Sequence, residues 1–256
     1  YQWWREPIFC GWGAQSHLAR SDGEPRKAPA YATQYNYDRF LAELESRGLN
    51  PGTIIIDDKW QATYGDPAPD SRKWPDLAGF IAAQHDKGRR VLLWLKAWDA
   101  EGVPVEECLL DAAGRPLAVD PANLTYEARL RRSVHRLIAD FGADGFKIDF
   151  THQLPNLSHR HGGRLWGIEL LHRLLQVIRS EAKSVKEDAL IIAHTANPYF
   201  ADVVDMVRLN DIAIIGGEES YAESMVDRQK VARAVSPYWL IDMDNWPSPS
   251  LAAWLE

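Results

Sequence analysis

The chain has 256 residues, of which 46% are apolar and 25% are charged, and its formal net charge is −7. This length and composition predict one large folded α/β domain spanning residues 1–256 rather than a disordered chain. The negative charge argues against nucleic acid or an anionic membrane surface as a partner. No apolar run reaches the roughly 18 residues that a membrane-spanning helix needs. Cys10 and Cys108 match no metal-ligand spacing, so we expect no metal site and no disulfide framework.

Strand-like apolar runs alternate with helical patterns along the chain, which is typical of a parallel sheet flanked by helices. In chain order, the pattern predicts a strand at Pro7–Gly11, a helix at Tyr37–Arg47, a strand at Thr53–Ile56, a helix at Asp76–Lys87, a strand at Arg90–Leu95, a helix at Thr125–Phe141, a strand at Phe146–Phe150, a helix at Leu165–Glu181, strands at Leu190–Ala193 and Asp205–Leu209, a helix at Ala222–Ala234 and a strand at Tyr238–Ile241. A long loop rich in Pro, Gly and Asp separates the third strand from the third helix. The order is that of a (β/α)8 TIM barrel, which we expect to be truncated before the eighth strand because the pattern ends near Glu256.

The segment from Gly142 to Phe150 is the most informative part of the chain. Gly142 and Gly145 suit the backbone that closes a helix and opens a strand. Lys147 and Asp149 alternate with apolar residues, so both point to the same face of the strand. Charged groups there are costly to bury unless they are paired or used, and barrel enzymes keep their chemistry at the carboxyl ends of the strands. A structural Lys–Asp ion pair is the alternative interpretation.

Polar residues also follow the other predicted strands, and in a parallel barrel all of them would meet at one rim. They are Asp57, Asp58 and Trp60 after the second strand, Lys96, Trp98 and Asp99 after the third, His194 after the fifth, and Arg208 and Asp211 at the end of the sixth. Carboxylates mixed with Lys, Arg and Trp suit sugar hydroxyls better than a transition metal, which would require more His at the strand ends. Alternatively, Asp57 and Asp58 cap a turn, and the tryptophans and His194 belong to the core.

Hydrolysis of a glycosidic bond needs two carboxyl groups, one to attack or to activate water and one to protonate the leaving oxygen. Asp149 and Asp211 come from strands two places apart, so they could face each other across a pocket. Lys147 and Arg208 would keep one acid ionised, whereas the other would need a raised pKa to donate a proton.

These residues carry a resemblance to the catalytic barrels of retaining α-glycosidases of glycoside hydrolase families 27, 36 and 31, above all the α-galactosidase type. Asp57-Asp58-Lys59-Trp60 resembles the Asp-Asp-x-Trp motif that follows the second strand, and Lys147-Ile148-Asp149 resembles the Lys-x-Asp motif of the nucleophile. The segment with Arg208 and Asp211 resembles the one that holds the acid/base. The resemblance implies a retaining exo-α-glycosidase that needs no cofactor. It assigns catalysis to Asp149 and Asp211, and it implies an oligosaccharide or glycoside as the substrate. The other residues expected to bind the sugar are Asp57, Asp58, Trp60, Lys96, Trp98, Lys147, His194 and Arg208.

Three other functions stay open from the sequence. Within the enzymes, the alternative is an α-glucosidase, α-xylosidase or transglycosidase of family 31 character. A non-catalytic carbohydrate-binding barrel fragment is the second alternative, and a metal-dependent hydrolase that uses the rim carboxylates is the third.

Overall fold

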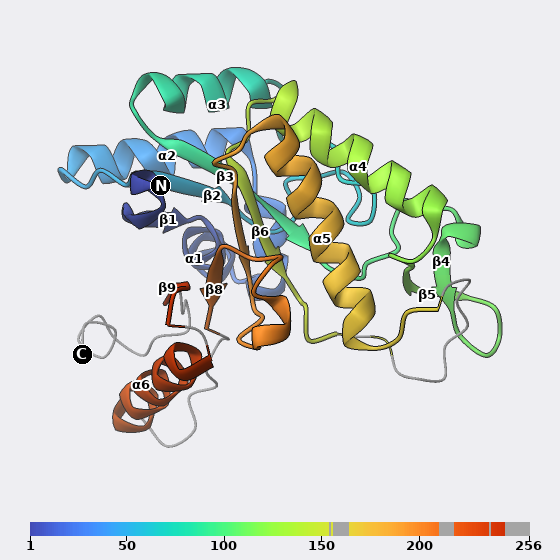
Figure 1. Ribbon diagram of the computed structural model, residues 1–256. Helices are drawn as coiled ribbons and strands as arrows, with labels where there is room; N and C mark the ends of the chain where they lie inside the picture. Colours follow the sequence, from blue (N-terminus) through green and yellow to red (C-terminus); the bar gives the residue numbers. More distant parts are fainter. Residues whose placement is uncertain (154, 156–163, 210–217, 236, 244–256) are drawn as a thin grey trace.

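Seven parallel strands form the central sheet of the computed structural model, which describes residues 1–153, 155, 164–209, 218–235 and 237–243. The strands are β1 (Ile8–Cys10), β2 (Thr53–Ile56), β3 (Arg90–Lys96), β6 (Gly145–Asp149), β7 (Leu190–Ala193), β8 (Met206–Arg208) and β9 (Leu240–Asp242). They lie side by side in chain order, and every neighbouring pair is parallel. The seven predicted strands are therefore confirmed, and the curled sheet with its helices fits a partial (β/α) barrel (Figure 1). The predicted truncation before an eighth strand concerns residues 244–256, which lie outside the described part of the chain.

Six α-helices accompany the sheet within the described residues, and three of them begin at residues whose side chains cap the first turn. They are α1 (Trp12–Ser21), α2 (Gln34–Ser46), α3 (Leu77–Asp86), α4 (Leu124–Ala139), α5 (Ile168–Val185) and α6 (Glu218–Val235). Thr33 caps α2, Asp76 caps α3 and Asn123 caps α4, each through a side-chain oxygen that accepts from a first-turn backbone N–H. Helices α2 to α5 lie along one face of the sheet (Figure 1).

The two faces of the sheet bury different sets of residues because side chains alternate along each strand. The outward set, for example Ile54, Leu93 and Phe146, packs under the helices in the large apolar core. The inward set forms a smaller apolar cluster inside the curled sheet, made of Ile55, Leu92, Leu190, Ile192 and Met206. Two residues beyond the inward Ile55, Ile192 and Met206, the chain reaches Asp57, His194 and Arg208. The apolar cluster is therefore the floor on which the polar rim is built.

Gly145 is required where β6 begins. Its φ is +144°, and a Cβ atom there would lie 2.0 Å from the backbone oxygen of Leu190 on the neighbouring strand. Gly142, with φ at +82°, ends the preceding helix in the left-handed conformation. The two glycines thus set the start of the strand that carries Lys147 and Asp149.

Two elements were not anticipated from the sequence. Helix α1 follows β1 directly, where no helix was predicted. The long loop after β3 contains a small antiparallel hairpin of β4 (Cys108–Leu110) and β5 (Pro116–Val119). Bidentate hydrogen bonds from Arg129 of α4 to Glu107, both at 2.8 Å, hold the start of this hairpin against the helix.

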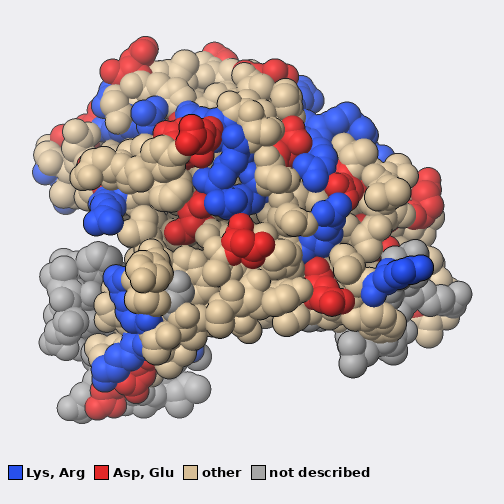
Figure 2. Space-filling model, in the orientation of Figure 1, with Lys and Arg blue, Asp and Glu red and all other residues tan. Residues whose placement is uncertain are grey.

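Ion pairs and tryptophans close the amino-terminal end of the barrel. The indoles of Trp3 and Trp4 donate to Asp188, to its carboxylate at 2.8 Å and to its backbone oxygen at 2.9 Å. Asp144, which has no exposed surface, accepts from the backbone N–H of Val91 and contacts His85, both at 2.7 Å. Acidic and basic side chains lie interspersed over the face shown in Figure 2, as expected of a surface held by such local pairs.

Replacing Asp144 by Ala should lower the free energy of unfolding by about 3–5 kcal/mol, because it removes a buried charge that accepts from the Val91 backbone N–H and pairs with His85 and Lys186. The measurement is chemical denaturation of both proteins. Glu43→Ala removes an exposed ion pair to Arg47 on α2 and should cost less than about 1 kcal/mol. Equal losses in the two variants would contradict a structural role for Asp144.

Candidate active site

A cavity of about 200 Å³ opens at the carboxyl ends of the central strands. It is lined by Trp12, Asp57, Asp58, Trp94, Lys147, Asp149, Phe150, His152 and Arg208. Five of these were predicted from the sequence, and they come from the ends of β2, β6 and β8. The structure therefore brings together residues that are up to about 150 positions apart in the chain, as a parallel barrel requires.

Asp149 ends β6 and is surrounded by donors and positive charge. Its Oδ1 accepts from the backbone N–H of Phe150 at 2.7 Å, and its Oδ2 accepts from the Trp94 indole at 3.2 Å. Burial disfavours the charge, but hydrogen bonding from His194 and the positive charges of Lys147 and Arg208 outweigh it. The pKa of Asp149 is consequently held well below its usual range. The side chain is therefore an anion throughout the neutral range.

His194 connects Asp149 to Arg208. Its Nε2 lies 3.2 Å from Oδ1 of Asp149 and also contacts Nη1 of Arg208. A guanidinium can only donate hydrogen bonds. Nε2 of His194 therefore either accepts a hydrogen bond from Arg208 or, when it carries a hydrogen, donates one to Asp149. The side chain of His194 is almost fully buried, and its Nδ1 has no hydrogen-bond partner among the described residues.

Asp57 and Lys147 form a buried ion pair beneath the cavity. Lys147 Nζ lies 2.8 Å from Asp57 Oδ2, and both side chains are only 3% exposed. Cys10 of β1 joins them: its Sγ is 3.0 Å from the same carboxylate oxygen and 3.2 Å from Nζ. The other oxygen of Asp57 accepts from the backbone N–H of Asp58 at 2.9 Å. Both carboxylate oxygens of Asp57 are therefore engaged within the protein.

Asp58 differs from its neighbour in both contacts and charge. Its Oδ1 accepts a hydrogen bond of 2.8 Å from the Tyr64 hydroxyl. Burial, together with the negative charges of Asp57 and Asp149, raises its pKa to about 6, against the lowering effects of Tyr64 and Lys96. Asp58 is thus a carboxylate that changes its protonation state close to neutrality while facing the cavity.

Four predicted sugar ligands do not line the cavity: Trp60, Lys96, Trp98 and His194, of which His194 instead contacts Asp149 as described above. Trp60 has no exposed surface and its indole donates to the Trp94 backbone oxygen, while Trp98 is 4% exposed and donates to Thr151. Neither offers a ring face on which a sugar could stack, so we place both in the core. Lys96 pairs with Asp99 at 2.6 Å and lies over the rings of Tyr64 and Phe150. Asp211, the predicted acid/base, lies outside the described residues.

The structure adds residues to the cavity that the sequence did not predict, namely Trp12, Trp94, Phe150 and His152. Trp12 follows Gly11, where a Cβ atom would lie 1.9 Å from the Tyr37 hydroxyl. That hydroxyl accepts from the backbone N–H of Asp57 at 2.7 Å and donates to Gln15 of α1 at 2.9 Å. Gly11 and Tyr37 therefore fix α1 and the Asp57 backbone together at the rim.

Backbone strain also gathers at this rim. Within the described residues, three non-glycine residues have positive φ: Lys59 at 71°, Trp98 at 72° and Phe150 at 57°. They follow β2, β3 and β6, so each loop leaves its strand through an unfavourable left-handed residue. Strain of this kind persists where the surrounding structure imposes it, and functional sites are common places for it.

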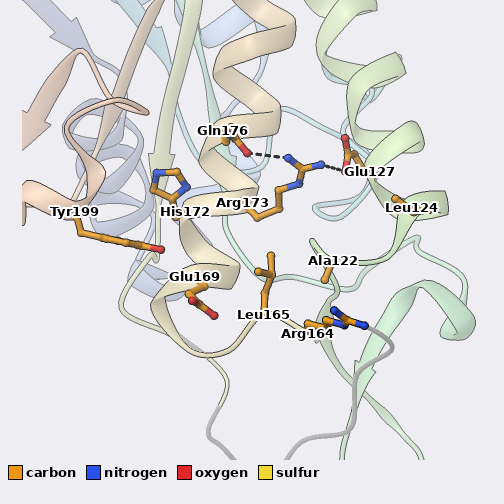
Figure 3. Close-up of a pocket in the computed structure, with 10 residues that line it drawn as sticks. All are labelled: Ala122, Leu124, Glu127, Arg164, Leu165, Glu169, His172, Arg173, Gln176 and Tyr199. Atoms are coloured by element: carbon orange, nitrogen blue, oxygen red, sulfur yellow. Dashed lines mark hydrogen bonds and ion pairs between the residues drawn. The ribbon is translucent and has the colours of Figure 1, made fainter.

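A larger cleft of about 430 Å³ lies elsewhere, between α4 and α5 (Figure 3). Its polar groups largely satisfy one another: Arg173 contacts Glu127 at 2.5 Å and Gln176 at 2.7 Å, as the dashed lines in Figure 3 show. It contains none of the rim carboxylates. The smaller central cavity is therefore the better candidate for an active site.

No protein-family model matches the sequence. The chain is 29% identical to an A type blood α-D-galactosamine galactosaminidase from Flavonifractor plautii, over a region that covers 47% of this chain and 14% of that protein. Among solved structures it is similar to an α-galactosidase from Thermus thermophilus in complex with stachyose, with a TM-score of 0.65 and 20% identity, covering 94% of this chain and 54% of that one.

A cycloalternan-degrading enzyme from Trueperella pyogenes is also similar, with a TM-score of 0.67 and 15% identity, covering 88% of this chain and 39% of that one. At these identities the structural likeness shows a shared fold, and the neighbours are glycosidases with barrel folds. This chain spans about half or less of the length of each of these proteins.

No group of three or more His, Cys, Asp or Glu side chains among the described residues is arranged to hold a metal ion. No helix within the same residues has both the length and the apolar character needed to cross a membrane.

The raised pKa of Asp58 predicts the direction in which stability changes with pH. Its folded value of about 6 exceeds the ordinary 3.8, so the folded state binds this proton more tightly and wild-type stability falls as the pH rises between these values. Asp58→Asn cannot titrate. The melting temperature of Asp58→Asn minus that of wild type should therefore be higher at about pH 7.5 than at about pH 4.

Asp111→Asn is the opposite-sign control. Hydrogen bonds from the backbone N–H and side chain of Arg115 lower the pKa of Asp111, so this variant should lose stability relative to wild type as the pH rises. If the difference in melting temperature between Asp58→Asn and wild type did not vary with pH, the environment assigned to Asp58 would be contradicted.

Proposed function

We propose that this protein is a retaining α-glycosidase that cleaves terminal α-linked sugars by double displacement at the central cavity. The observation that carries the proposal is Asp149: a carboxylate kept ionised by cationic neighbours, facing a polar cavity at the carboxyl end of a parallel barrel. The similarity to a galactosaminidase and the shared fold with glycosidases support the same reaction class.

In the proposed mechanism, Asp149 attacks the anomeric carbon and forms a covalent glycosyl-enzyme as the leaving oxygen takes a proton from Asp211. Asp211 then removes a proton from water, which attacks the anomeric carbon and releases both the sugar and Asp149. Arg208, His194 and Lys147 keep Asp149 deprotonated, and the hydrogen bonds from Trp94 and Phe150 fix its orientation. Such positioning places a reactant close to its attack geometry before reaction.

For the sugar itself we propose a galacto-configured ring. The similar proteins include a galactosaminidase and an α-galactosidase, and galactose and galactosamine share the axial 4-hydroxyl. Asp58, which lines the same cavity as Asp149, is the proposed acceptor for such a hydroxyl. A buried charged acceptor rejects an epimer that leaves it unpaired, so it can discriminate strongly.

A gluco-configured substrate is the second candidate, because the cycloalternan-degrading enzyme shares the fold to a similar degree. The two candidates differ in the orientation of one hydroxyl. Comparing kcat/KM for aryl α-galactosides, aryl α-galactosaminides and aryl α-glucosides decides between them. No turnover of any aryl α-glycoside would contradict the proposed function.

Asp149→Asn should remove hydrolysis almost completely, by at least about 10³-fold in kcat, because the amide is a poor nucleophile and carries no charge. Asp205→Asn is the matched control. Asp205 is at the amino-terminal end of β8, where it pairs with Lys183 at 3.0 Å and Arg179 at 3.3 Å, so that variant should lose stability but keep kcat. Substantial turnover by Asp149→Asn would refute the nucleophile assignment.

Asp211→Ala should slow substrates according to their leaving groups. A dinitrophenyl glycoside needs little protonation and should lose little in the first step, whereas an alkyl glycoside should lose about 10²–10⁴-fold. Proton NMR of the first product should show the α-anomer, and we expect the two carboxyls to lie about 5–5.5 Å apart in a retaining enzyme. A β-anomer as the first product would indicate inversion and contradict the mechanism.

A further inference from the structure

Asp58 lines the cavity, and one of its two carboxylate oxygens is held by the protein. Oδ1 accepts from the Tyr64 hydroxyl at 2.8 Å. The backbone groups of Asp58 are also engaged, the N–H by Asp57 at 2.9 Å and the oxygen by Gln15 at 3.3 Å. Within the described residues, Oδ2 accepts no hydrogen bond, although Asp58 lines the cavity. The orientation of Oδ2 therefore depends on the single side-chain contact at Oδ1.

Tyr64 is itself held from several directions. Lys59 Nζ lies 3.9 Å and Lys96 Nζ 4.5 Å from the centroid of its ring, and the ring meets Trp94 edge-on at 5.9 Å. Both lysines are anchored, Lys59 by Glu101 at 2.5 Å and Lys96 by Asp99 at 2.6 Å. Cation–π contacts of this kind fix the ring plane.

The backbone of Tyr64 is tied to the same cluster, because its N–H donates to Glu101 at 3.1 Å. The loop after β2 and the loop after β3 thus share one set of contacts around this ring. These contacts consequently fix the position of the hydroxyl that donates to Asp58.

We propose that Tyr64 is a positioning residue that orients Asp58 so that Oδ2 accepts a substrate hydroxyl, and that the preference for one hydroxyl configuration depends on this contact. The sugar-binding part rests on the glycosidase function proposed above. A carboxylate with one oxygen fixed offers its second oxygen in one direction, so an axial and an equatorial hydroxyl cannot both meet it well.

Losing the phenol should also change the charge state of Asp58. A hydrogen bond to the ionised form favours that form, so its removal raises the pKa of the carboxyl further. The other charged groups that act on Asp58 are Asp57, Asp149, Lys96 and Lys73. Tyr64→Phe leaves these groups in place and keeps the ring that Lys59 and Lys96 contact, so it isolates the hydroxyl.

The first measurement is independent of any enzymatic activity. Carbon-13 NMR of aspartate-labelled protein follows the carboxyl titration of Asp58, whose signal is assigned by its loss in Asp58→Asn. Tyr64→Phe should shift this titration upward by about one pH unit, the equivalent of one charged hydrogen bond. Tyr199→Phe, which alters a half-exposed tyrosine outside the cavity, should leave it unchanged.

The second measurement concerns sugar choice. The ratio of kcat/KM between the preferred glycoside and its 4-epimer should fall about tenfold in Tyr64→Phe. In a background of Asp58→Asn, the same substitution should change the ratio no further, because the group that Tyr64 positions is already gone.

An unchanged Asp58 titration in Tyr64→Phe overturns the proposal. A shifted titration with an unaltered epimer ratio in an active enzyme overturns the role in specificity. A shifted titration in a protein that hydrolyses neither epimer supports the contact between Tyr64 and Asp58 and refutes the proposed glycosidase function instead, so the two failures are distinguishable.

Discussion

The buried ion pair between Lys147 and Asp57 is the interaction on which the candidate site depends. It joins β6 to β2, and Cys10 extends it to β1. Removing two charges from water costs several kcal/mol per ion, which only close geometry and further hydrogen bonds can offset. Asp57 has those bonds on both oxygens. The pair therefore links three strand ends, and its Lys147 supplies one of the positive charges that lower the pKa of Asp149.

This arrangement separates the roles of the two adjacent aspartates. Asp57 is saturated and almost fully buried, so it acts as a scaffold, whereas Asp58 keeps one oxygen toward the cavity and titrates close to neutrality. The pKa values of Asp149 and Asp58 are consequently shifted in opposite directions, although both residues line the same cavity.

The two ends of the barrel use carboxylates differently. At the amino-terminal end, Asp144, Asp188 and Asp205 accept from backbone N–H groups, indoles and basic side chains, which anchor the strands and the first turn of the chain. At the carboxyl end the carboxylates face a cavity. The same residue type thus stabilises one rim and leaves chemistry to the other, as the architecture of (β/α) barrels allows.

The strands and most helices could be predicted from the sequence because their apolar periodicity matches the final burial. Thr53–Ile56 and Leu190–Ala193 match the structure to the residue. Helix α1 could not be predicted, since its apolar face is weak and its position is imposed by Gly11 and Tyr37.

At the rim, the alternation of apolar and polar residues along the strands was enough to predict that Asp57, Lys147, Asp149 and Arg208 come together. It could not say that Trp60 and Trp98 turn into the core, because that depends on how the loops after β2 and β3 fold. Trp98 itself adopts a left-handed backbone that directs its indole toward Thr151. Nor does any local pattern link Tyr64 to Asp58, because the Tyr64 ring is also contacted by Lys96 from the end of β3.

The most direct test of the account is to trap the covalent intermediate. An α-galacto-configured epoxide or aziridine that reacts with the catalytic nucleophile of retaining enzymes should add one label per chain. Mass spectrometry of the digested protein should place it on the peptide that contains Asp149, and excess substrate should protect the site. A label on another carboxylate, such as Asp58, would contradict the central claim.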